Sequence, residues 1–195
     1  MIKNDFTLIK EAQKGNTKAF EELIYRYDKQ VLGIAASFRN SEEDAKDIYQ
    51  EVFMRVYKGL KNFQFRSEFS TWLFRITTNV CITYKSKVTR NMHESLDREI
   101  GNEDGEGSTL SDFIAGEERT DNKVVGADIS RYINTALDTL PAQQKMAFTL
   151  KFYEGYKIRE ISEMMNCTEG TIKRYLFTGT NKMRDLLGNI FNMEL

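Results

Sequence analysis

The chain has 195 residues, of which 41% are hydrophobic and 12% aromatic, enough to bury one core of ordinary size or two small ones. It has no run of about eighteen apolar residues, and residues 1–10 alternate charged and apolar side chains, which excludes a membrane span and a signal peptide and predicts a cytoplasmic protein. The two cysteines are far apart in sequence, which suits neither a disulfide framework nor a metal site.

Charge is distributed unevenly along the chain, although the net value is only -1. Lys and Arg outnumber Asp and Glu by 16 to 11 in residues 1–90, whereas acids outnumber bases by 10 to 3 in residues 91–127. Residues 128–195 are nearly neutral, with 9 bases and 8 acids. This pattern predicts two domains, 1–90 and 128–195, joined by an acidic linker at 91–127, with a front half suited to a polyanion.

Apolar residues recur at three- and four-residue spacing through most of the chain, so the fold class predicted is all α. The first helix is expected over residues 5–14 and the second over 17–38. A third follows an N-cap at Ser41, with its apolar stripe ending at Val56, and a fourth covers residues 69–87 after a loop at 61–68. These four helices would make the first domain.

Between about Arg90 and Gly126 the periodicity fails, and the glycine and acid content there predicts an unfolded linker. A second helical domain is expected from Asp128, with Pro141 in the first turn of its second helix. Two further helices flank the short turn 166–168, where Thr168 is the N-cap of the last one. This is the pattern of a helix-turn-helix.

Catalytic chemistry is poorly represented in the sequence. The single histidine, His93, lies at the edge of the acidic linker, and no nucleophile, paired acid and base, or metal cluster stands out, so we expect neither an enzyme nor a cofactor. Asp47, Gln50 and Glu51 form an acidic and polar stripe on one helix. That stripe is either a solvated face or a surface that a partner protein binds.

Nucleic-acid features are better placed. Aromatic residues alternate with cations over residues 61–90, which suits single-stranded nucleic acid, because bases stack on rings while cations follow phosphates. The alternative is a helix whose aromatic residues are core and whose cations are solvated. Lys173 and Arg174 on the second helix of the helix-turn-helix fit docking in a major groove, although such units also bind proteins.

Two stretches carry a specific resemblance. DAKDIYQEVFMRVYKGLKNF followed by FSTWLFRITTNVCITY resembles region 2 of the extracytoplasmic-function (group 4) sigma factors of the sigma-70 family, and LPAQQKMAFTLKFYEGYKIREISEMMNCTEGTIKRYL resembles their region 4. The resemblance covers residues 5–88 and 129–190 in the family's order. The QEVF and STWL blocks exclude a response-regulator output domain, which the second stretch alone would fit.

The resemblance implies a non-enzymatic RNA polymerase subunit with three sets of site residues. Those expected to bind the clamp helices of the largest polymerase subunit are Asp47, Gln50, Glu51 and Phe53. Those expected at the minus-10 element, with the 63–68 loop and Asn79 forming a pocket for a flipped base, are Phe63, Phe65, Arg66, Ser67, Thr71, Trp72, Arg75, Asn79, Lys85 and Lys87. Those expected at the minus-35 element are Thr168, Thr171, Lys173, Arg174 and Phe177.

Further partners implied are promoter DNA, the flap of the second largest polymerase subunit, and an anti-sigma factor or another recruiting partner.

Two departures from the family pattern matter. In the family, the base-capturing loop commonly reads F-R-G-x-S-x-F, but in this chain the first Phe is followed by Gln64, Phe65 and Arg66. The recognition helix of the family commonly has two further cations at the positions where this chain has Thr-Gly-Thr, residues 178–180. The first departure leaves the preferred minus-10 base open. The second predicts either that region 4 reads DNA weakly on its own or that a partner supplies upstream specificity.

Competing functions are a stand-alone helix-turn-helix regulator, an enzyme acting on nucleic acid, and an adaptor that docks proteins. The regulator would bind duplex DNA without polymerase, whereas a sigma factor would need core enzyme. The two motifs in family order favour the sigma factor.

Overall fold

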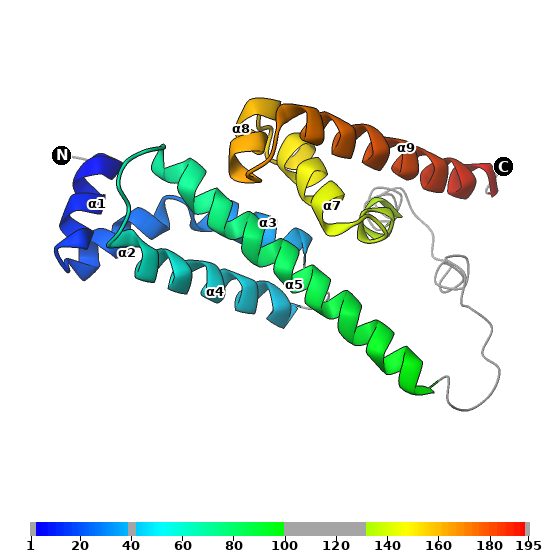
Figure 1. Cartoon of the computed structure of the whole chain (residues 1–195), viewed down its shortest axis with the longest axis horizontal. Coiled ribbons are helices and arrows are strands. Elements are labelled where there is room, and N and C mark those ends of the chain that lie inside the picture. Colours follow the sequence, from blue (N-terminus) through cyan, green and yellow to red (C-terminus); the bar gives the residue numbers. More distant parts are fainter. Residues whose placement is uncertain (1–2, 39–41, 100–131, 194–195) are drawn as a thin grey trace, which may run out of the picture.

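The computed structural model describes residues 3–38, 42–99 and 132–193, and all the regular structure in those ranges is helical, as predicted (Figure 1). The helices in chain order are α1 (Asp5–Gln13), α2 (Thr17–Tyr25), α3 (Asp28–Ser37), α4 (Glu42–Leu60), α5 (Phe69–Glu99), a segment at 132–138, α7 (Ala142–Phe148), the π-helical turn η2 (Thr149–Tyr153), α8 (Ile158–Met164) and α9 (Glu169–Met193). Within the described ranges, no helix combines the length and apolar character needed to cross a membrane.

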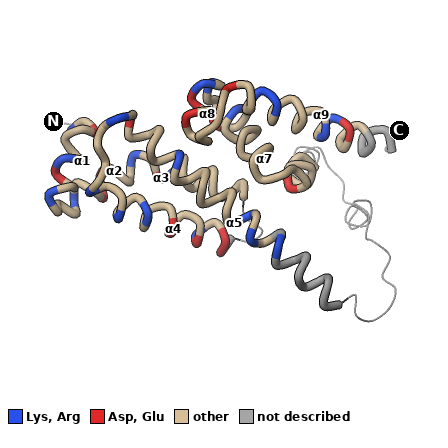
Figure 2. Tube along the Cα trace, in the orientation of Figure 1, with Lys and Arg blue, Asp and Glu red and all other residues tan. Residues whose placement is uncertain are grey.

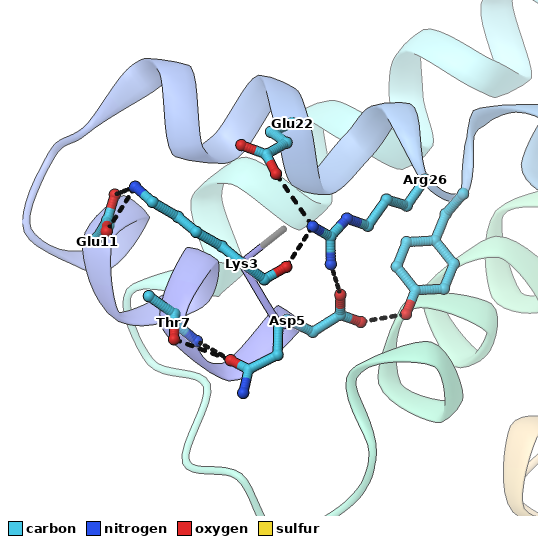
Figure 3. Close-up of polar contacts among 8 residues, drawn as sticks. Lys3, Asp5, Thr7, Glu11, Glu22 and Arg26 are labelled. Carbon is cyan, nitrogen blue, oxygen red and sulfur yellow. Dashed lines mark hydrogen bonds and ion pairs between the residues drawn. The ribbon is translucent and has the colours of Figure 1, made fainter. Parts of the chain in front are cut away.

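The single helix predicted over residues 17–38 is wrong, because the structure breaks it at Arg26 and Tyr27 into α2 and α3. Both backbone amides donate to carbonyls three residues earlier, which tightens the chain into a turn. The Arg26 guanidinium donates to Asp5 Oδ1 at 2.6 Å, and the Tyr27 hydroxyl donates to Asp5 Oδ2 (Figure 3). Burial, and then the bond to Asp5, raises the pKa of Tyr27. The bonds from Arg26 and Tyr27 to Asp5 of α1 therefore favour a turn at a place where the apolar spacing alone predicted a continuous helix.

The N-terminal unit, residues 3–99, packs α1 to α5 around one apolar core whose fully buried members include Leu8, Leu23, Ile34, Val52 and Leu73. The α4 helix begins at Glu42, as expected for a cap at Ser41, although Ser41 lies outside the described residues. These helices place the 61–68 loop at the end of α4, beside α1 (Figure 1).

The α5 helix begins at Phe69 as predicted but continues to Glu99, so its predicted end at residue 87 is wrong. No Gly or Pro occurs between Phe69 and Gly101, and residues with ordinary helix propensity extend a formed helix even without an apolar stripe. The first nine residues of the predicted linker are therefore helical. The rest of it, residues 100–127, lies outside the described residues.

The C-terminal unit, residues 132–193, contains the predicted helix-turn-helix. Pro141 is the N-cap of α7, one residue before its predicted place in the first turn. After η2 the chain turns at Gly155, whose φ is 75°. The turn between α8 and α9 has Asn166 at a φ of 52°, and Thr168 Oγ1 then accepts from the Thr171 amide at 3.1 Å. The predicted N-cap of the last helix is thus confirmed.

The two units pack against each other, with α7 and α8 along α5 (Figure 1). Two domains joined by a linker were expected from the sequence, and no packing between them was predicted. In the structure, one continuous apolar cluster includes buried residues from both units. The contacts that join them are the Arg75 guanidinium donating to Glu163 O at 3.0 and 3.2 Å, the Thr78 hydroxyl donating to Met164 O at 3.1 Å, and the Phe74 and Tyr156 rings with centroids 5.6 Å apart.

A group of charges also lies in this junction. The Lys145 side chain is 4% exposed, with Nζ 2.5 Å from Asp138 Oδ1 and 5.2 Å from the centroid of the Phe38 ring. From α5, Lys85 Nζ donates to Asp138 O at 2.8 Å and lies 3.8 Å from the same carboxylate. Burial, and then the charge of Lys145, lowers the pKa of Lys85 to about 8. One carboxylate therefore serves two ammonium groups and couples the units.

Candidate nucleic-acid and polymerase interfaces

The acidic surface predicted on α4 is present in the structure. Asp47 and Gln50 are exposed, and Glu51 is half-exposed with Oε1 accepting from Arg55 Nε at 2.6 Å. Figure 2 shows that the acidic positions of α4 gather toward its N-terminal end. The spacing of Asp47, Gln50 and Glu51 places all three on one side of α4. Because the opposite side of the helix is in the core, this surface is held on a rigid support.

Phe53 does not belong to that surface. It is 8% exposed and packs in the core, with its ring centroid 4.7 Å from that of Tyr49. A buried ring cannot meet a partner, so the placement of Phe53 among the contact residues is corrected. Met54, which the sequence reasoning missed, is 50% exposed and lies one turn beyond Gln50. Extending the helical period from Gln50 would have found it.

The loop at 61–68 is supported from beneath. Phe63 is buried, with its ring centroid 5.0 Å from that of Trp72. The Gln13 side-chain amide, at the end of α1, donates to Leu60 O at 3.0 Å and to Phe63 O at 2.9 Å. Phe63, a predicted DNA contact, therefore has a structural role: its buried ring and bonded carbonyl hold the first part of the loop in place.

Phe65 has a φ of 56°, in the left-handed region, at the position where the family pattern commonly has glycine. Such a backbone costs a residue other than glycine roughly 1–3 kcal/mol. An open cleft of about 420 Å³ lies between the loop and α1, lined by residues of α1 and by 65–69. Arg66 and Ser67, both predicted contacts, are exposed and line this cleft.

Three predicted DNA residues recur every four positions on α5, at Thr71, Arg75 and Asn79, and so share one face. Asn79 is exposed, but it lies ten residues beyond Phe69, about 15 Å along the helix axis. It does not line the loop cleft. The structure therefore separates Asn79 from the loop with which the resemblance had joined it.

Trp72 is half-buried between the loop and α4. A Cβ atom added to Gly59 would lie 3.0 Å from Trp72 Cζ2, so the indole can approach α4 this closely only because residue 59 is glycine. The cations beyond Trp72 differ from one another. Arg75 and Lys85 bond to the C-terminal unit, as described above, whereas Lys87 is exposed.

The helix-turn-helix presents its predicted residues openly. Lys173 and Arg174 are exposed near the start of α9, and Phe177 is 70% exposed one turn later. The hydroxyls of Thr168 and Thr171 lie 2.9 Å apart and hydrogen-bond to each other, so both side chains help to cap the start of α9. Ile172, between them and the cations, is fully buried and anchors the helix.

The unusual stretch 178–180 is divided between surface and core. Thr178 is exposed, whereas Gly179 is buried. A Cβ atom at Gly179 would meet Leu140 Cδ1 at 3.6 Å and Gln144 Cβ at 3.9 Å, which are ordinary van der Waals distances. The glycine therefore faces the interior of the unit.

Comparison with known proteins covers both units. Residues 23–91 match the model of sigma-70 region 2, and residues 130–183 match that of sigma-70 region 4. The ECF RNA polymerase sigma-E factor of Haemophilus influenzae is 29% identical over 185 residues, which are 95% of this chain and 94% of that protein. The ECF sigma factor SigW of Bacillus subtilis is 28% identical over 182 residues, with coverage of 93% and 96%.

Two solved structures share the fold. CnrH in complex with the cytosolic domain of CnrY aligns with a TM-score of 0.65 at 20% identity, covering 95% of this chain and 97% of that one. The sigma factor RpoE of Bartonella quintana, in complex with the anti-sigma factor NepR, aligns with a TM-score of 0.60 at 20% identity, covering 88% and 98%. With both regions matched in order, the chain belongs to the extracytoplasmic-function sigma factors of the sigma-70 family, non-enzymatic subunits that bind core RNA polymerase and promoter DNA and direct transcription initiation.

Proposed function

We propose that the acidic surface of α4, completed by Met54, is the docking site for the clamp helices of core polymerase. Asp47, Gln50 and Glu51 supply charge and hydrogen-bonding groups, which steer association and set the register of the partner. Met54 supplies an exposed apolar side chain at the same face, suited to packing against a helix. The observation that carries the proposal is this mixed stripe on a helix whose other side is core.

The loop cleft and the α5 face are proposed to act on the minus-10 element. Binding of a flipped base by the 63–68 loop would offset part of the free energy needed to melt the duplex, and would do so best for the base that fits the loop. The Thr71, Arg75 and Asn79 face would then follow the unpaired strand along α5, with Lys85 and Lys87 as further phosphate contacts. The supporting observation is the open cleft beside a loop braced by Gln13.

The exposed side of α9 is proposed to meet the minus-35 element, and the C-terminal unit to meet the polymerase flap. The cations available on α9 near its start are Lys173 and Arg174, because the usual later cations are replaced at 178–180. Each phosphate contact contributes to the salt dependence of binding. We therefore expect the minus-35 contribution to be modest, with upstream specificity coming from a recruiting partner.

An anti-sigma factor is a further proposed partner, as for the structural relative bound to NepR. A cleft of about 610 Å³ between the units is lined by three cations, Lys85, Arg90 and Lys182, and by the carboxylate of Asp138. An acidic segment of a partner protein would fit this lining. We also propose that the chain acts in the cytoplasm, where core polymerase works.

Reconstituted transcription tests the proposal. Core polymerase with this protein should initiate from a subset of a promoter library, and the transcripts should share a minus-10 sequence. Binding of duplex DNA by the protein alone, with no transcripts when core enzyme is added, would support a stand-alone regulator and contradict the proposed docking.

A further inference from the structure

The base-capturing loop depends on α1 for its shape. Phe65 adopts its left-handed backbone without glycine, and its ring is packed on two sides. The ring centroid of Phe65 lies 4.9 Å from that of Phe6 on α1 and 5.0 Å from that of Phe63. These ring contacts offset the unfavourable backbone of the loop. The first helix is therefore part of the loop's structure.

The same aromatic group has an open side. Phe6 is 56% exposed, which is unusual for a ring that only completes a core. Lys10, one turn along α1, holds its Nζ 4.8 Å from the Phe65 centroid and 5.8 Å from the Phe6 centroid. Exposed ring faces with an adjacent cation are the parts from which single-stranded nucleic-acid sites are built, since bases stack and phosphates pair.

The cleft beside these rings offers groups for a base edge. Arg66 can donate and Glu68 can accept, and both line the cleft on the loop side. On the α1 side the acid is Asp5, whose carboxylate already accepts from Arg26 and Tyr27 (Figure 3). Arg26 pairs with this carboxylate and also with Glu22, so the charge of Asp5 is compensated in part and its repulsion of a phosphate is reduced.

We propose that Phe6, Lys10 and Phe65, the aromatic platform, form a second base site beside the base-capturing loop. The unpaired non-template nucleotide next to the captured base stacks on the platform, and Lys10 contacts its phosphate. This inference rests on the proposed function of the loop and extends the minus-10 site to α1. It also gives the substituted residue Phe65 a role in holding the unpaired strand.

Abasic substitution in the promoter tests the platform in the complete holoenzyme. Each non-template nucleotide of the minus-10 element is replaced in turn by an abasic residue, and open-complex yield is measured. With the unaltered protein, yield should fall about tenfold at two adjacent positions, the captured base and its neighbour, since loss of one stacked base removes an interaction of this size. With Phe6→Ala, the penalty at the neighbour should disappear and that at the captured base should remain.

Two variants separate stacking from support of the loop. Phe6→Leu keeps apolar contact with Phe65 but offers no ring, so it should behave like Phe6→Ala, whereas Phe6→Trp should keep both penalties. Tyr25→Ala removes an exposed ring on α2 and should change neither. Thermal melting of each variant checks that the fold is intact.

The outcomes distinguish this proposal from the function on which it rests. A neighbour penalty that persists in Phe6→Ala or Phe6→Leu, or that is absent from the unaltered protein while the captured-base penalty is present, overturns the platform alone. The absence of any abasic penalty overturns base capture by the loop, and the platform with it.

Discussion

The two units present their cations in opposite ways. In the N-terminal unit, Arg75 donates to Glu163 O and Lys85 to Asp138 O, so these two α5 cations are satisfied by the C-terminal unit. Lys87, further along α5, is exposed. In the C-terminal unit, Lys173 and Arg174 are exposed on α9. A donor that is already satisfied can reach a phosphate only after it leaves its acceptor. The proposed phosphate contacts of Arg75 and Lys85 would therefore require the units to separate, whereas those of the exposed Lys87 and of the α9 cations would not.

The difference also concerns support. The N-terminal loop and Trp72 are held by close contacts from α1 and α4, while the α9 groups extend into solvent from a capped helix. Substitutions in the N-terminal unit should accordingly have larger effects on transcription than substitutions in α9.

The largest loss is expected from Glu51→Lys, on the acidic surface. The proposed docking pairs this acidic surface with basic groups of the clamp helices. Charge reversal would then place like charges together at a cost of several kcal/mol, so binding to core polymerase should weaken by about a hundredfold or more. Co-purification with core enzyme measures this. Glu21→Lys, an equal reversal at an exposed position of α2, serves as the control and should bind normally. Normal co-purification of Glu51→Lys would remove the docking assignment.

Opening of the junction can be measured with Cys81, which lies between Thr78 and Lys85 on the same side of α5. Its thiol is fully buried, and burial raises its pKa to about 12, so it should react very slowly in the native protein. In a Cys167→Ser background, Asp138→Asn should accelerate labelling of Cys81 by about tenfold or more, because Lys145 would be left buried without its carboxylate.

Asp185→Asn removes the same charge from an exposed site on α9 and should leave labelling unchanged. Circular dichroism of both variants checks that helix content is retained. Rapid labelling of the unaltered protein would show that the units separate readily and would contradict the closed junction.

Asn79→Ala should lower open-complex yield about tenfold, the effect of losing one hydrogen bond to a charged or polar group of the strand. A pre-melted bubble should not restore the yield, because the amide is proposed to contact the unpaired strand. Ser86→Ala, which removes an exposed hydroxyl that bonds Ile82 O on the same helix, is the control. Full recovery in the bubble would instead place Asn79 in the melting step alone.

Removing both cations of α9, in Lys173→Ala/Arg174→Ala, should reduce the salt slope of promoter binding by about two and transcription only modestly. Arg184→Ala, further along α9, should leave the slope unchanged. Scrambling the minus-35 sequence should likewise have a modest effect. A fall of about a hundredfold would mean that α9 reads DNA as strongly as the N-terminal unit does.

The smallest effects are expected at glycines. Gly179→Ala should stabilise the protein by about 0.5–1 kcal/mol, because alanine favours helix and its Cβ makes ordinary contacts. Gly188→Ala, with open space around it, should give a similar gain from propensity alone. Gly59→Ala requires Trp72 to shift by a few tenths of an ångström, so its gain should be smaller than that of Gly179→Ala. Thermal melting measures all three, and a destabilising Gly179→Ala would show tighter packing than these distances indicate.

Helix periodicity was sufficient to predict the elements that carry their own apolar stripe. The starts of α1, α4 and α5, the helix-turn-helix and the Thr168 cap all follow from local spacing and capping residues. The acidic surface of α4 was also predictable, because three polar residues at helical spacing have to share a face.

The remaining features depend on contacts that spacing does not encode. The break at Arg26 is fixed by Asp5, which is distant in sequence. Phe53 and Met54 lie about 100° apart around α4. Phe53 lies at the edge of the apolar stripe, and only the packed structure shows that its ring is buried while Met54 is exposed. The junction uses backbone carbonyls such as Glu163 O as acceptors, and no side-chain pattern reveals those.

Phe65 has an evolutionary consequence. A glycine at this position is indifferent to the residues around it, whereas phenylalanine at a φ of 56° depends on the rings of Phe6 and Phe63. Residues that share contacts in this way are energetically coupled, so their substitutions are not additive. A descendant that lost Phe6 first would retain the backbone cost without its compensation, while one that gained glycine at position 65 first would be free to vary α1. The order of substitutions is thus constrained, and lineages that keep Phe65 should keep an aromatic residue at position 6.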